Sequence, residues 1–111
     1  MSLKLQTLNA NDSLTNLELA INQTEQMGFE LNSLAKGFVS KQPANVATFK
    51  RLTPGTSPAG GVVTLVEESA ESQLSQQEDD LNSTEAAGKR LISYATVYVQ
   101  GNETNVAVFR G

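Results

Sequence analysis

The sequence predicts an α+β fold made of two βαββ units. Residues 61–111 repeat residues 1–51 at a constant offset of 60, and 16 of the 51 paired positions are identical. Average composition would give about three identities by chance. In each copy, short apolar runs at the start and end flank a segment with apolar residues at helical spacing. We therefore expect an internally duplicated βαββ-βαββ fold with pseudo-twofold symmetry, a mainly antiparallel sheet and helices on one face.

The two copies are expected to share one core. A unit of about 50 residues buries too little apolar surface to be stable by itself. An uncharged segment rich in Pro and Gly, residues 53–61, separates the copies and breaks both helices and strands. The prediction is a single domain of three parts: repeat one (residues 1–51), a linker (52–60) and repeat two (61–111).

Each copy opens with a short apolar strand, marked by Leu3, Leu5 and Leu8 in repeat one and by residues 62–66 in repeat two. Helices are then expected over 12–27 and 72–87. In the first helix, Leu14, Leu17, Ile21 and Thr24 recur every three or four positions and therefore lie on one helical stripe.

A glycine, Gly28 or Gly88, is expected to end each helix in the left-handed conformation. The second helix has a thinner apolar stripe of Leu74, Leu81 and Ala87, so we expect it to pack more weakly.

The strand after each glycine alternates between two kinds of side chain. Leu31, Ser33 and Ala35 match Leu91, Ser93 and Ala95, and their small size predicts a face covered by the helix. A turn near residues 41–43 or 100–102 leads to a last strand, Val46–Phe49 or Val106–Arg110. The opposite face is too apolar to stay in water, so its residues are interface candidates: Leu34, Phe38, Ile92, Tyr94 and Tyr98.

Composition argues against most catalytic chemistry. The chain has no His and no Cys, so it lacks the imidazole and thiol groups that most hydrolytic and redox chemistry uses. We expect no catalytic residues, no cofactor and no metal site. The consecutive acidic residues Glu78, Asp79 and Asp80 spread around a helix, so they are interpreted as a solvated face rather than as cation ligands.

Charge is divided unevenly between the copies, with +1 in residues 1–51 and −5 in residues 61–111. Opposite signs favour the pairing of unlike copies. Neither copy has the basic stripe that nucleic acid requires, and Lys36, Lys41, Lys50 and Arg51 are interpreted as ordinary surface charge. No long apolar run or signal sequence is present, so we expect a cytoplasmic protein without membrane contact.

The strongest repeated polar signal is Asn-x-Thr-Glu, at Asn22 to Glu25 and at Asn82 to Glu85. One interpretation makes Asn22, Glu25, Asn82 and Glu85 a pseudo-symmetric ligand site. The favoured interpretation is structural: the threonines bond back to their own helix, and the Asn and Glu side chains make local bonds near the helix end.

The first copy carries Gly28, Glu30, Leu31 and Ser33 after its helix and ends with Phe-Lys-Arg at residues 49–51. In these features the chain resembles a tandem copy of a small bacterial βαββ unit, the domain of unknown function 4177, with each copy covering one unit. Family members carry a Trp after the glycine, where this chain has Phe29 and Lys89. The resemblance implies a fold and a tendency to oligomerise, without any catalytic residue.

These observations predict a small non-enzymatic bacterial protein that acts as an interaction or assembly module, with a homo-oligomer or another protein as partner. The alternative is a small-molecule binding protein with its site between the two repeats, against the tyrosines.

Overall fold

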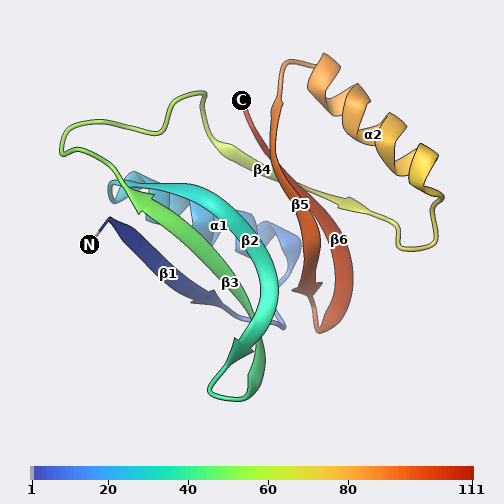
Figure 1. Cartoon of the computed structure of the whole chain (residues 1–111), viewed down its shortest axis with the longest axis horizontal. Helices are drawn as coiled ribbons and strands as arrows, with labels where there is room; N and C mark the ends of the chain where they lie inside the picture. Colours follow the sequence, from blue (N-terminus) through green and yellow to red (C-terminus); the bar gives the residue numbers. More distant parts are fainter. Residues whose placement is uncertain (1) are drawn as a thin grey trace.

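Two βαββ units follow one another along the chain, as predicted (Figure 1). The structure is a computed structural model and describes residues 2–111. Its elements are β1 (Leu3–Leu8), α1 (Leu14–Gln26), β2 (Phe29–Val39), β3 (Gln42–Arg51), β4 (Val63–Glu68), α2 (Leu74–Ala86), β5 (Arg90–Val99) and β6 (Asn102–Arg110).

Each unit forms its own three-stranded antiparallel sheet with the last strand in the middle. Sheet 1 has the order β1-β3-β2, and sheet 2 has the order β4-β6-β5. The strand registers are also equivalent, since Leu5 pairs with Thr48 in sheet 1 and Leu65 pairs with Val108 in sheet 2. The tandem duplication in the sequence is thus a duplication of structure.

The two helices occupy equivalent positions but differ in their ends. Gly28 and Gly88 follow them with the same φ of 98°, a left-handed conformation that glycine adopts without strain. At the start of α1, the Ser13 hydroxyl accepts a hydrogen bond from the Asn16 N–H (3.2 Å), whereas Gln73 at the start of α2 makes no such bond. α2 therefore lacks a stabilising contact that α1 has.

A β-bulge corrects the predicted faces of β2 and β5. The register shifts between Leu31 and Ser33, and at the equivalent place in β5. A bulge inserts one residue and reverses the alternation beyond it. Ser33 and Ala35, predicted to face the helix, therefore lie on the face of sheet 1 that is away from α1, and Leu34 lies on the α1 side. The same reversal applies to Ser93, Ala95 and Tyr94.

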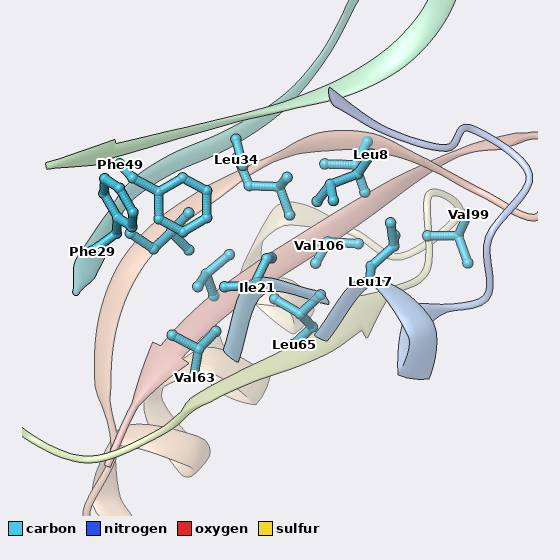
Figure 2. Close-up of a cluster of buried hydrophobic side chains, with 14 residues drawn as sticks. Leu8, Leu17, Ile21, Phe29, Leu34, Phe49, Val63, Leu65, Val99 and Val106 are labelled. Atoms are coloured by element: carbon cyan, nitrogen blue, oxygen red, sulfur yellow. The ribbon is translucent and has the colours of Figure 1, made fainter. Parts of the chain in front are cut away.

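α1 lies between the two sheets. Leu17 and Ile21 are fully buried, and Figure 2 shows them between side chains of both sheets. On one side is sheet 1, represented by Leu34. On the other is sheet 2, represented by Val63 and Leu65, which belong to the same core cluster. The shared core expected from the short length of each copy is present, and α1 is its centre.

α2 lies on the outer face of sheet 2 and contributes no buried residue (Figure 1). Gln77 and Leu81 stand at the positions of Leu17 and Ile21, and neither is fully buried. The order of layers is therefore sheet 1, α1, sheet 2, α2.

This stacking brings unlike surfaces together. A twofold axis between the units would match every α1–β4 contact with an α2–β1 contact. α1 packs against β4, but α2 has no comparable contact with β1. The most extensive contact between the units joins the equivalent strands β2 and β5, as pseudo-twofold symmetry predicts. The helices depart from this symmetry, because repeat one uses its helical side and repeat two uses the face of sheet 2 opposite α2, so the contact of α1 with sheet 2 is of the head-to-tail kind.

Within residues 2–111, neither helix is long and apolar enough to cross a membrane.

We expect Ile21→Ala to lower the free energy of unfolding by about 2–5 kcal/mol, because it leaves a cavity in a fully buried site. Leu81→Ala, the matched change 60 residues on, is expected to cost less than about 1.5 kcal/mol because Leu81 is only half-buried. Urea unfolding of both variants measures the difference. Equal losses of stability would show that the two helices contribute equally to the core.

Candidate interaction surface

The side of α1 that faces away from sheet 1 binds the unpaired edge of β4. Its side chains form the backbone hydrogen bonds that a neighbouring strand would otherwise form. The Asn22 amide donates to the Val63 carbonyl oxygen and accepts from the Val63 N–H, both at 2.9 Å. The Glu18 carboxylate accepts from the Leu65 N–H at 2.8 Å. β4 is an edge strand, and these bonds satisfy backbone groups that would otherwise lack partners in the interior.

A buried ion pair lies beside these bonds. The Glu25 carboxylate accepts from both terminal nitrogens of Arg110, and it also accepts from the Leu31 N–H at 2.7 Å. The side chains of Arg110 and Glu25 are 1% and 5% exposed. Hydrogen bonding to Glu25 raises the pKa of Arg110, so the guanidinium stays charged. Because a buried ion is costly without its partner, this pair ties α1 to β6 in a defined register.

The other edge of sheet 2 is bound in the same way. Asn45 of β3 is fully buried; its amide accepts from the Tyr98 N–H (2.7 Å) and donates to the Tyr98 carbonyl oxygen (2.8 Å). Repeat one therefore places one asparagine on each edge strand of sheet 2. At the nearby surface, Lys36 pairs with Glu103.

The β5–β6 turn completes the contact between the repeats. The N–H groups of Gln100 and Gly101 donate to the carbonyl oxygens of Asp12 (2.9 Å) and Ala10 (2.8 Å) in the loop before α1. Any side chain at position 101 would touch Asn11, since a Cβ there would lie 3.2 Å from the Asn11 Oδ1. Backbone and side chain thus both contribute to the docking of repeat two on repeat one.

The same surface exists a second time, uncovered, on repeat two. We call it the α2 groove, a depression of about 300 Å³ between α2 and β5. Its lining residues are Leu74, Gln77, Glu78, Leu81, Asn82, Glu85, Leu91 and Tyr94. Glu78, Asn82 and Glu85 stand at the positions of Glu18, Asn22 and Glu25, the residues that bind repeat two. Among residues 2–111, the side chains of these three make no hydrogen bond or ion pair.

Carboxylates surround the tyrosine at the floor of the groove. Burial raises the pKa of the Tyr94 phenol, and the charges of Glu68 and Asp80 raise it further. Burial likewise raises the pKa of Glu68, with a hydrogen bond to Asp80 as the second cause. The Tyr94 hydroxyl donates to Gln77 and stays protonated at neutral pH. The groove itself combines apolar lining residues with two carboxylates, Glu78 and Glu85.

The five interface candidates do not form one continuous face. Leu34 is buried against α1, while Tyr94 lies under α2 at the equivalent position. Phe38 and Tyr98 continue the same faces beyond the helices, and Phe38 is strongly exposed. Ile92 sits at the bulge, on the core side. Of the five, only Tyr94 lines the groove.

The repeated Asn and Glu residues are also separated, so they do not form one pseudo-symmetric ligand site. Asn22 and Glu25 bind repeat two, whereas Asn82 and Glu85 line the open groove. The expected threonine bonds are present: the Thr24 hydroxyl donates to the Ala20 carbonyl oxygen (3.1 Å), and Thr84 makes the same bond to Asp80 (3.2 Å). Asn22 and Glu25 make the expected local bonds as well, since the Asn22 amide donates to the Glu18 carbonyl oxygen (3.2 Å) and Glu25 accepts from the Leu31 N–H (2.7 Å). Their bonds to Val63 and Arg110 of repeat two were not predicted.

Sequence reasoning missed Glu18, Asn45 and Arg110. Glu18 and Asn45 are identical in both copies, as Glu78 and Asn105. Identity between the copies was therefore the signal that could have found them. Arg110 is matched by Lys50, so only the charge is repeated.

No group of three or more acidic side chains within residues 2–111 is arranged to hold a metal ion. No protein-family model, curated protein or solved structure matches the chain, so its resemblance to the domain of unknown function 4177 stays a prediction.

We expect Asn22→Ala to lower the free energy of unfolding by about 1–3 kcal/mol, since it leaves the N–H and C=O of Val63 without partners in a buried setting. Asn82→Ala removes the matching side chain from an open surface and is expected to cost less than about 0.5 kcal/mol. Thermal unfolding of the two variants provides the comparison. If Asn82→Ala proves as costly as Asn22→Ala, the bonds to β4 do not explain the role of Asn22.

Proposed function

We propose that this chain is a non-enzymatic interaction module of bacterial, cytoplasmic type, and that the α2 groove is where it binds a protein partner. One observation carries the proposal. The surface of repeat one that corresponds to the groove already binds a sheet, through the same Glu, Asn and Glu side chains. The groove keeps these residues and has nothing bound to them within the chain.

The chemistry of the groove indicates the kind of partner. Asn82 can bond to both the N–H and the C=O of an extended strand, as Asn22 does with Val63. Leu74, Leu81 and Leu91 offer apolar contact to alternate side chains of that strand. Glu78 and Glu85 favour a basic residue beside it. The partner is therefore an exposed strand edge with apolar and basic side chains.

A small apolar molecule is the second candidate ligand, favoured by the predominantly apolar lining of the groove. It would bind against Tyr94, as the sequence suggested, but on the outside of repeat two. The depression between the repeats is lined mainly by charged and polar side chains, and neither tyrosine lines it.

The test is a titration of the isotope-labelled full chain, followed by NMR, with two probes: an extended peptide of alternating leucine, lysine and threonine, and indole. We expect the peptide to shift the amide signals of Glu78, Asn82 and Leu91. Asn82→Ala should weaken this binding by about 5- to 30-fold, the range for loss of one or two hydrogen bonds. Ser83→Ala, the neighbouring exposed position outside the groove, is the matched control and should bind as the unmodified chain does.

Binding of indole in the groove without binding of the peptide would favour the small-molecule alternative. Binding of neither probe would contradict both.

A further inference from the structure

We propose that the partner of the α2 groove is a second copy of this chain, which docks through the outer side of its own β1 and β3. This inference rests on the proposed function of the groove and names its occupant. The structure contains a template for the contact, because repeat one binds repeat two through the surface that the groove duplicates.

The surface that would enter the groove is the counterpart of the one repeat two uses. We call it the β1 surface. Its residues, Leu3, Leu5, Val46, Thr48 and Lys50, are the counterparts of Val63, Leu65, Val106, Val108 and Arg110, which repeat two buries against repeat one. All five lie on the face of sheet 1 away from α1, by the strand register.

Exposure distinguishes the two surfaces. Val63 and Leu65 are 1% and 5% exposed, whereas Leu3 and Leu5 are 60% and 70% exposed. Two neighbouring leucines on an edge strand, with free backbone groups beside them, are a recognised site for pairing with another chain. A second copy would remove this apolar surface from water.

Each hydrogen bond between α1 and β4 has a counterpart that α2 of one copy could form with β1 of another. In β4, the N–H and C=O of Val63 and the N–H of Leu65 point away from β6 toward α1. The equivalent register of β1 directs the same groups of Leu3 and Leu5 away from β3, toward solvent. The side chains of Asn82 and Glu78 of another copy would form hydrogen bonds with these backbone groups.

The charges match as well. Arg110 binds Glu25 inside the chain; at the counterpart positions, Lys50 is exposed and Glu85 lines the groove. A second pair comes from the turn: a side chain at position 101 would touch Asn11, and the counterparts of these two positions are Lys41 and Glu71. Both pairs place a lysine of repeat one against a glutamate of repeat two. The net charges of +1 and −5 favour the same pairing.

The turn itself has the conformation that the contact needs. Ser40 and Lys41 have φ of 51° and 69°, close to the 51° and 82° of Gln100 and Gly101. A lysine is held in this left-handed region at some cost in strain. The turn in repeat one is thus shaped to donate to the loop before α2 of another copy, as Gln100 and Gly101 donate to the loop before α1.

The resulting contact joins unlike surfaces, so each copy keeps one free groove and one free β1 surface. Repetition of such a contact gives a ring if the rotation closes and a filament if it does not.

Two single variants test the direction of the contact. Leu5→Asp places a charge on the β1 surface and leaves the groove intact, while Leu74→Asp does the converse. Both leucines are exposed, so folding is expected to be retained, which circular dichroism checks. Leu19→Asp, an exposed leucine of α1 outside both surfaces, is the matched control.

Sedimentation velocity over a range of concentrations gives the readout. The unmodified chain and Leu19→Asp should reach multiples of the chain mass of 11.9 kDa, while each blocked variant alone should stay at 11.9 kDa. A 1:1 mixture of Leu5→Asp and Leu74→Asp should form a species of twice that mass, because one intact groove and one intact β1 surface remain.

An unmodified chain that stays at 11.9 kDa up to about 1 mM would overturn this inference. Peptide binding in the groove would then still support the proposed function. A chain that neither self-associates nor binds the peptide would overturn this inference and the proposed function. A dimer that resists both substitutions, or a mixture that remains monomeric beside two monomeric variants, would also overturn the head-to-tail contact.

Discussion

α1 supplies the apolar surface that both sheets share, and the two sheets are positioned against it. Leu17 and Ile21 face sheet 1 and sheet 2 together and are fully removed from water. Burial of such side chains stabilises a fold by about 1.5–3 kcal/mol each. A three-stranded sheet with one helix is too small to provide a core of this kind alone. One helix between two sheets therefore makes a single core from two short units.

The polar contacts around α1 determine the orientation and register of repeat two on repeat one. Hydrophobic burial is not directional, so it would allow sheet 2 to slide or turn on α1. Asn22 and Asn45 bind the backbone of opposite edge strands, and Glu25 binds Arg110 in a buried ion pair. Each would leave a buried group without a partner if the register changed. The chain thus encodes one arrangement of its repeats, and we propose that the same residues in repeat two make a second contact of the same kind.

The sequence predicted the elements well and their faces less well. The constant offset identified both units, and the helical spacing and glycines placed both helices within two residues of their ends. The bulge at residues 31–33 reversed the predicted faces of β2 and β5, because nothing in a single strand marks one inserted residue. Identity between copies marked Asn22 and Glu25 as constrained, but it does not reveal whether their partner lies in the same unit, the other unit or another molecule. That distinction depends on tertiary packing.

Native-state hydrogen exchange of α1 and α2, in a dilute monomeric sample, tests most directly whether α1 is the shared core. The account predicts that amides in the middle of α1, from Leu17 to Ile21, exchange only through global unfolding. Amides from Gln77 to Leu81 in α2 should exchange at least about 100-fold faster, through local opening, because this helix buries no residue. Equal protection of the two helices, or stronger protection of α2, would contradict the account.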